Sequence, residues 1–131
     1  MANAYKVLVI DDDPQFIDLM QSLLTAEGYE VASCTRGADA HHLAREVRPD
    51  VITLDLRMPD LSGWEVLQQL RSDSDLLRIP VLVISAAGAE LAETNERLRD
   101  LGYHDVSILV KPFEIDELLG RLADAIIRGS G

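Results

Sequence analysis

Residues with carboxylate, hydroxyl and amine side chains follow the short apolar runs of this sequence, at the point where each run ends. Asp11 and Asp12 follow one run, and Asp55, Ser85 and Lys111 each follow another. In open parallel sheets, ligands bind beyond the carboxyl ends of the strands, which meet at one rim. We therefore expect these side chains to converge on a single site.

The three aspartates of this set predict a metal site. Two carboxylates about 4 Å apart repel by roughly 4 kcal/mol at an effective dielectric constant near 20, so the cluster needs a cation or protons. Oxygen ligands without Cys or His favour Mg²⁺, which keeps several waters and takes only one or two protein carboxylates. Such a site leaves coordination positions open for a phosphoryl oxygen.

Phosphoryl chemistry gives each residue of the set a role. With a cation in place, Asp55 can act as a nucleophile toward phosphorus, and Lys111 supplies a second positive charge. Ser85 can donate a hydrogen bond to a phosphoryl oxygen once it has arrived, which makes it a candidate trigger for rearrangement. Ser85 or Lys111 alone would be unremarkable, so the joint pattern carries this interpretation. Asp13 is better explained as a helix cap.

The apolar runs themselves predict buried strands. Nearly continuous β-rich runs span residues 7–10, 51–54, 81–84 and 108–110. Continuous runs are typical of strands that helices cover on both faces, whereas half-exposed strands alternate. Residues 30–34 are more mixed and indicate a strand at the edge of the sheet.

Between the strands, apolar residues recur with the period of a helix. The stripes are Phe16, Leu19, Met20, Leu23 and Leu24; Ala40, Leu43, Ala44 and Val47; Val66, Leu67 and Leu70; and Ile115, Leu118, Leu119, Leu122 and Ile126. Asp13 with Pro14, and Ser62 with Glu65, have the spacing of helix starts. Residues 90–101 form the weakest stripe and predict the loosest helix. Strand and helix thus alternate five times, which implies a three-layer, doubly wound α/β fold with a parallel sheet.

Composition limits the size of the molecule and its partners. The 131 residues, 47% of them apolar, suit one domain. No apolar run reaches the roughly 18 residues of a membrane span, and the first residues lack the pattern of a signal peptide. We therefore expect a cytoplasmic protein without membrane association. The formal net charge of −11 disfavours direct binding of nucleic acid by this chain.

Taken together, the motifs resemble the receiver domains of bacterial two-component response regulators. They are Val9-Ile10-Asp11-Asp12-Asp13, Arg48-Pro49-Asp50-Val51, Asp55-Leu56-Arg57-Met58-Pro59 through Gly63, Ser85-Ala86, and Lys111-Pro112-Phe113. The resemblance covers residues 5–128, which we take as the domain, with flexible ends at residues 1–4 and 129–131. It implies a flavodoxin-like (βα)5 fold whose five parallel strands have the order 2-1-3-4-5.

By position, the resemblance also implies a role for each site residue. Asp12 would be a direct metal ligand, Asp11 a ligand largely through water, and Asp55 both a ligand and the phosphoacceptor. The backbone carbonyl of Arg57 would be a further ligand of Mg²⁺ or Mn²⁺.

The remaining roles concern the response and the partners. Ser85 would take the hydroxyl role of the family, Lys111 would pair with the carboxylate or phosphoryl group, and the bond to Pro112 would be cis. The donor would be a phosphohistidine on a sensor histidine kinase or a histidine phosphotransfer domain. The response would reach an output domain or a second copy of the chain, so the module signals rather than turning over a substrate.

Some positions depart from the family pattern. The residue three before Lys111, often Tyr or Phe in the family, is Ile108, and the approach from Gly102 to Lys111 is about two residues longer. Arg57 and Ala87 occupy the positions two after Asp55 and two after Ser85, whose side chains border the phosphoryl group in this family.

Three alternatives use the same fold or chemistry. A phosphatase of the haloacid dehalogenase type would need a second aspartate at the position of Arg57 and a cap domain. A flavodoxin-like mononucleotide binder would place a phosphate where Asp11, Asp12 and Asp13 repel it. A pseudo-receiver would keep the fold as a docking module without phosphorylation, although every residue of the expected site is present.

Overall fold

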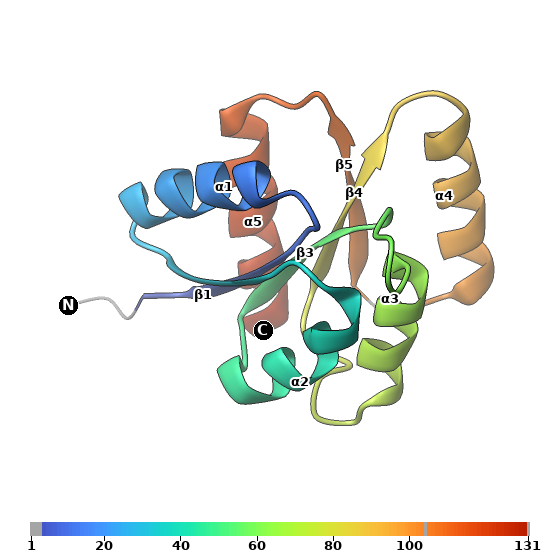
Figure 1. The fold of residues 1–131 in the computed structure, drawn as a ribbon, viewed down its shortest axis with the longest axis horizontal. Helices are drawn as coiled ribbons and strands as arrows, with labels where there is room; N and C mark the ends of the chain where they lie inside the picture. Colours follow the sequence, from blue (N-terminus) through green and yellow to red (C-terminus); the bar gives the residue numbers. More distant parts are fainter. Residues whose placement is uncertain (1–3, 104, 131) are drawn as a thin grey trace.

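Strands and helices alternate along the chain, as the sequence predicts. The computed structural model describes residues 4–103 and 105–130. The elements are β1 (Lys6–Ile10), α1 (Pro14–Ala26), β2 (Glu30–Cys34), α2 (Gly37–Val47), β3 (Val51–Asp55), α3 (Gly63–Ser72), β4 (Val81–Ala86), α4 (Ala89–Leu101), β5 (Val106–Lys111) and α5 (Ile115–Ser130) (Figure 1). Within the predicted flexible ends, residues 1–3 and 131 lie outside the described part of the chain. Helix α5 continues to Ser130, beyond the domain end predicted at Arg128.

The sheet is parallel and has the strand order β2-β1-β3-β4-β5, which confirms the predicted topology. Its register pairs Ile10 of β1 with Leu54 of β3, so the residues that follow them, Asp11 and Asp55, are neighbours. On the other side of β3, Ser85 of β4 pairs with Val110 of β5. The carboxyl ends of all five strands therefore share one edge.

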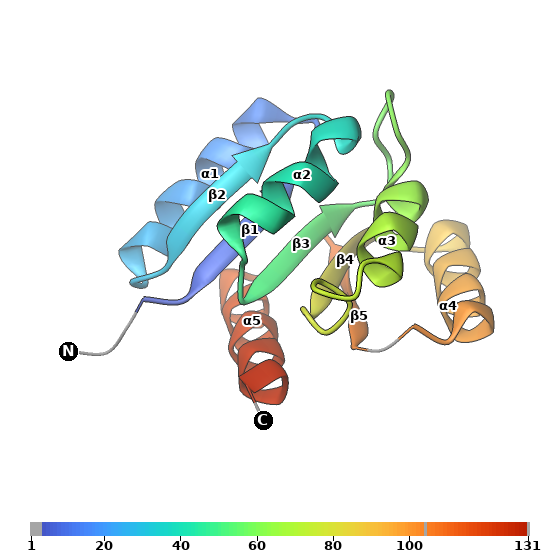
Figure 2. The same cartoon turned by 90° about the horizontal axis from the view of Figure 1, so that it is seen from below.

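Helices cover both faces of the sheet, which gives the molecule three layers (Figures 1 and 2). Successive strand residues point to opposite faces. Val7 and Val9 of β1 pack in a buried cluster with α1 and α5, whereas Leu8 and Ile10 pack in a second cluster with α2 and α3. The nearly continuous apolar runs thus serve two cores at once.

The predicted helix starts are present. The Asp13 side chain accepts a hydrogen bond from the Gln15 amide at 3.0 Å and caps α1, which begins at Pro14. The Ser62 hydroxyl accepts from the Glu65 amide at 3.4 Å and caps α3. These caps fix where the two loops beside the acidic residues end and their helices begin.

Two residues of the four stronger helix stripes are in fact exposed. Leu19 is 54% exposed and Ile115 is 48% exposed, whereas Ile17 is buried. Ile17, Met20 and Leu24 are spaced by three and four residues and face the sheet, and Leu19 lies off that line. Apolar character alone therefore placed Leu19 on the wrong face.

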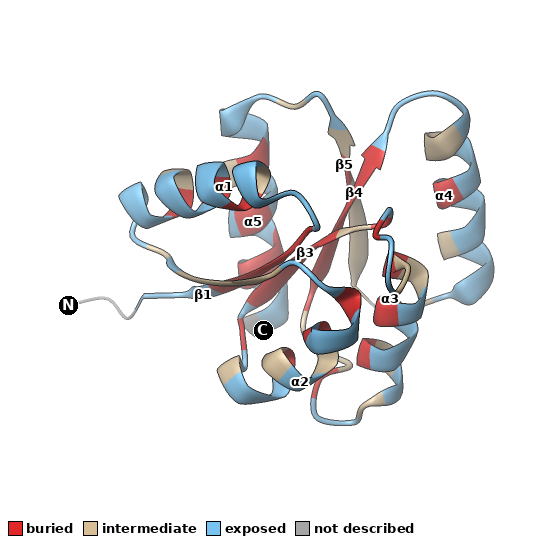
Figure 3. Ribbon diagram, in the orientation of Figure 1, coloured by how far each residue is buried: buried red, intermediate tan, exposed pale blue. Residues whose placement is uncertain are grey.

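Helix α4, which has the weakest apolar stripe in the sequence, is the least buried helix among the described residues. Its one buried residue is Thr94, and most of its surface is exposed (Figure 3). It starts after Gly88 without a side-chain cap. No helix in residues 4–103 and 105–130 has the length and apolar character needed to cross a bilayer.

Candidate functional site

Three carboxylates meet at the carboxyl edge of the sheet. Asp11 follows β1, Asp12 follows it, and Asp55 is the last residue of β3. One carboxylate oxygen from each lies within 4.8 Å of the others. Asp11 is buried, Asp55 half-buried and Asp12 exposed, so the cluster is open to solvent on one side. In the described part of the chain, this is the one group of three or more potential metal-ligating side chains so arranged.

Burial makes this cluster costly when it is fully ionised. Desolvation raises the pKa of Asp11 to about 6, against the lowering effect of the hydrogen bond from the Asp13 amide. The pKa of Asp55 is raised, mainly by desolvation, while its hydrogen bond from Arg57 and the charge of Lys111 oppose the rise. A bound cation would remove the cost of holding both carboxylates ionised.

The donor atoms of the cluster fit Mg²⁺. Oδ1 of Asp11 accepts from the Asp13 amide at 2.9 Å, but Oδ2 is buried and has no hydrogen-bond partner among the described residues. A buried carboxylate oxygen without a partner is unfavourable unless a cation or water meets it. Oxygen ligands with one open side are what Mg²⁺ prefers in proteins.

The loop between β3 and α3 is held at both ends. A Cβ atom on Gly63 would lie 2.5 Å from the Asp55 carbonyl oxygen, so only glycine allows α3 to start this close to the strand. The carboxylate of Asp60 accepts hydrogen bonds from the Gly37 and Ala38 amides, both at 3.1 Å, at the start of α2. These contacts fix the loop that carries Arg57.

The Ser85 hydroxyl hydrogen-bonds to groups of β4 and α4. Ser85 is 1% exposed, and the one proton of its hydroxyl has two acceptors within reach, the Ala86 carbonyl at 3.1 Å and Glu90 Oε2 at 3.2 Å from Oγ. It also lies 3.5 Å from the Thr94 hydroxyl. The structure thus places Ser85 at the expected edge, with its side chain turned to α4.

Lys111 lies at the end of β5 and near the aspartates. Its charge lowers the pKa of both Asp11 and Asp55, yet among the described residues it forms no ion pair with a carboxylate. Its Nζ lies 4.9 Å from the ring centroid of Phe16 in α1. The Lys111–Pro112 peptide bond is cis, the isomer that the resemblance implies.

Two features of the site were not anticipated from the sequence. Glu90 reaches back from the first turn of α4 to Ser85, and the Phe16 ring supports Lys111. An acidic residue in the first turn of a helix is common, because it interacts favourably with the helix dipole. The sequence therefore gave no sign that Glu90 contacts Ser85, other than their separation of five residues.

A cleft of about 340 Å³ lies between α3 and α4, beside the site. Its lining includes Arg57, Trp64, Glu90 and Glu93. The Arg97 guanidinium lies over the Trp64 ring, 4.4 Å from its centroid, and so joins the two helices.

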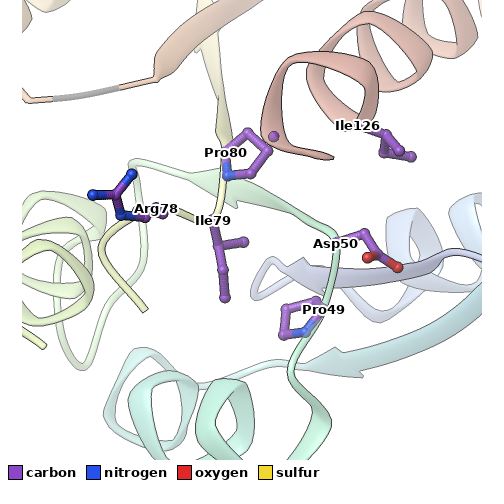
Figure 4. A pocket seen from close by; sticks show the side chains of 7 residues that line it. Pro49, Asp50, Arg78, Ile79, Pro80 and Ile126 are labelled. Atoms are coloured by element: carbon purple, nitrogen blue, oxygen red, sulfur yellow. The ribbon is translucent and has the colours of Figure 1, made fainter. Parts of the chain in front are cut away.

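A second hollow lies at the opposite edge of the sheet, where β3 and β4 begin (Figure 4). Its volume is about 180 Å³, and Pro49, Asp50, Pro80 and Ile126 are among the residues that line it. Asp50 already accepts a hydrogen bond from the Lys6 amide at 2.7 Å. Ligands of open parallel sheets bind at the other edge, so we place the functional site at the aspartates.

A known family matches this fold and edge of the sheet. The model of the response regulator receiver domain matches residues 7–123. The chain belongs to this family. The receiver function and fold predicted from the sequence are therefore confirmed, and nothing favours a pseudo-receiver.

Relatives of this receiver domain include transcriptional regulators. The chain is 40% identical over 124 residues to the transcriptional regulatory protein KdpE of Mycobacterium tuberculosis, covering 95% of this chain and 52% of KdpE. It is 34% identical over 117 residues to the phosphate regulon transcriptional regulatory protein PhoB of Rhizobium meliloti, covering 89% of this chain and 50% of PhoB. The receiver domain thus spans about half the length of these relatives.

Solved receiver structures agree with the fold. The chemotaxis protein CheY4 of Vibrio cholerae is similar with a TM-score of 0.81 and 28% identity, covering 94% of this chain and 99% of CheY4. The receiver domain of the sensor histidine kinase PA1611 of Pseudomonas aeruginosa has a TM-score of 0.80 and 27% identity, covering 95% of this chain and 98% of that one. That structure has a magnesium ion coordinated in its active site cleft.

Proposed function

We propose that Asp55 is the phosphoacceptor of this receiver domain, in a reaction that depends on Mg²⁺ or Mn²⁺. The observation that carries the proposal is the carboxylate cluster, in which a buried oxygen of Asp11 has no hydrogen-bond partner among the described residues and Asp55 is half-buried beside the exposed Asp12. The donor is a phosphohistidine on a sensor histidine kinase or a histidine phosphotransfer domain.

The chain's own residues would divide the work as follows. Asp11, Asp12, Asp55 and the backbone carbonyl of Arg57 would hold the cation, which offsets negative charge at the site when bound. The Arg57 amide, which donates to Asp55 Oδ1 at 3.0 Å, orients the carboxylate so that its other oxygen can attack phosphorus while the phosphorus–nitrogen bond of the phosphohistidine breaks and its imidazole leaves. Lys111 adds a positive charge beside the aspartates.

The phosphorylated state is read by a change of contacts. Ser85 Oγ donates to a phosphoryl oxygen instead of to Glu90, and α4, the least buried helix, follows. The chain then signals in the cytoplasm to an output segment, to a partner protein or to a second copy of itself. The regulators that it resembles are twice its length, which supports an output segment for transcription control.

Replacement of the phosphoacceptor tests this function. Acetyl phosphate with Mg²⁺ should add the mass of one phosphoryl group to the wild-type chain, and beryllofluoride with Mg²⁺ should bind to it. Asp55→Asn should abolish both, because the amide is not a nucleophile toward phosphorus and does not replace the carboxylate oxygen that binds beryllium.

Asp100→Asn is the matched control, since Asp100 is an exposed aspartate on α4. It should be modified like the wild type. Phosphoryl incorporation that persists in Asp55→Asn, measured by intact mass spectrometry, would refute the assignment.

A further inference from the structure

The Ser85 hydroxyl has one proton and several acceptors on one side. Its partners are the Ala86 carbonyl, Glu90 Oε2 and the Thr94 hydroxyl, all in β4 or α4. Thr94 is itself 2% exposed and donates to the Glu90 carbonyl at 2.7 Å. Among the described residues, none of these partners belongs to the aspartate cluster, so the hydroxyl is committed to α4.

Glu90 is the charged member of this group and joins three segments. Its Oε2 also accepts from the Ala86 amide, and its Oε1 pairs with Arg57 Nε of the loop after β3. The Glu90 side chain is 19% exposed, against 78% for Arg57. The pKa of Glu90 is lowered, first by the Ala86 hydrogen bond and also by Arg57 and Ser85, so the carboxylate is ionised at neutral pH.

We propose that Glu90 is a positioning residue of the phosphorylation site, which retains the Ser85 hydroxyl on α4 and so sets how readily that hydroxyl turns to a phosphoryl group on Asp55. This inference rests on the proposed function of Asp55. A hydroxyl has one donor, so Glu90 and a phosphoryl oxygen compete for it. The ion pair with Arg57 holds the Glu90 carboxylate in place for that competition.

Weakening the Glu90 contact should therefore strengthen binding of a phosphoryl mimic. Hydrogen bonds to an ionised group are roughly twice as strong as neutral ones, so Glu90→Gln should tighten binding of beryllofluoride about threefold and Glu90→Ala about tenfold. The probe is beryllofluoride at saturating Mg²⁺, and fluorine NMR measures the bound fraction. Thermal melts of each variant establish that it is folded.

Glu93→Gln is the matched control. Glu93 lies one turn further along α4, lines the same cleft as Glu90 and makes none of these contacts. The control removes the same charge beside the site, so it measures the general electrostatic effect on an anionic ligand. The affinity of Glu93→Gln for beryllofluoride should stay within about twofold of the wild-type affinity.

A double-mutant cycle with Ser85→Ala tests the route of the effect. If Glu90 acts by holding the Ser85 hydroxyl, Glu90→Gln should change the affinity by less than about twofold in the Ser85→Ala background. A gain that survives in that background would mean that Glu90 acts through Arg57, and would overturn the inference.

The remaining outcomes separate this inference from the proposed function. Wild-type binding with unchanged affinity in both Glu90 variants would refute the role of Glu90 and leave Asp55 as the phosphoacceptor. Wild-type binding no stronger than that of Asp55→Asn would refute both.

Discussion

The carboxyl edge of the sheet has two halves that differ in how ready they are for a phosphoryl group. In the half formed by β1 and β3, the aspartates are already together, and the loop after Asp55 is fixed by Gly63 and Asp60. In the half formed by β4, β5 and α4, the Ser85 hydroxyl is hydrogen-bonded to Glu90 at the start of α4. For the proposed phosphorylation of Asp55, the acidic half is preorganised, whereas the hydroxyl half must change its contacts.

This difference separates capture of the phosphoryl group from the response to it. Residues that capture the group need fixed geometry, and the acidic half is anchored to α2 and α3. Residues that respond need two arrangements of similar free energy, and the hydroxyl half leads to α4, whose one buried residue is Thr94. Variants in the two halves should therefore alter different measurements.

The largest effect is expected from Asp11→Asn in the acidic half. Asparagine keeps the acceptor for the Asp13 amide but removes the buried charge. Mg²⁺ affinity should fall on the order of 100-fold, or about 2.7 kcal/mol, because one carboxylate charge is lost and solvent on the open side screens part of the roughly 4 kcal/mol between unit charges about 4 Å apart. Mg²⁺ titrations followed by calorimetry measure this loss.

The same variant should be more stable than the wild type when no metal is present. At neutral pH the ionised Asp11 is destabilising, and solvent at the rim screens part of that cost, so the gain should be about 1 to 2 kcal/mol. Urea melts in EDTA test this, and a less stable variant would argue against the charge repulsion.

The next largest effect is expected from Gly63→Ala, which disturbs the close contact between α3 and the end of β3. The added Cβ would meet the Asp55 carbonyl oxygen and Leu56 Cα, both at 2.5 Å. Shifting this backbone should cost about 1–3 kcal/mol of stability and weaken Mg²⁺ binding. Gly120→Ala in α5 is the control, because a Cβ there meets nothing within 4 Å. It should raise stability by about 0.5–1 kcal/mol in the same urea melts.

Ser85→Ala should affect the hydroxyl half alone. Binding of beryllofluoride should weaken about tenfold, since one hydrogen bond to a charged ligand is lost. Mg²⁺ affinity without beryllofluoride should stay within about twofold of the wild type, because the Ser85 hydroxyl forms no hydrogen bond with the aspartates in the described part of the chain. Equal losses in the two titrations would show that the two halves are not separate.

The smallest effect is the pH dependence of stability and Mg²⁺ affinity, which depends on Asp11 in the acidic half. The pKa of Asp11 is higher in the folded protein, so its protonation stabilises the metal-free folded state. This stabilisation is fully present below about pH 4 and is lost as the pH rises through about 6. Mg²⁺ needs the ionised form, so its affinity should rise about fourfold from pH 5.5 to pH 7.5. Asp11→Asn should flatten this dependence, and an equally steep profile in the variant would assign it to another group.

The acidic half was predictable from the sequence because its position follows from topology. Asp11, Asp12 and Asp55 lie at or directly after the ends of buried strands, and parallel strands end at one edge whatever the details of packing. The caps at Asp13 and Ser62 also depend on local patterns, whereas the strand order was implied by the family resemblance.

The contacts of the hydroxyl half could not be predicted in the same way. The orientation of Ser85 depends on where α4 docks, and α4 has a weak apolar stripe and no side-chain cap. The contact of Lys111 with Phe16 joins residues far apart in the sequence. Leu19 shows the same limit on a smaller scale, because its exposure depends on the rotation of α1 about its axis.

The position of Trp64 gives a fluorescence signal for movement of α4. It is the single tryptophan of the chain, and it lies on α3 with the Arg97 guanidinium of α4 over its ring. A cation over an indole affects its emission, so movement of α4 away from α3 changes the intrinsic fluorescence. The unlabelled protein therefore reports movement of α4 relative to α3 in real time.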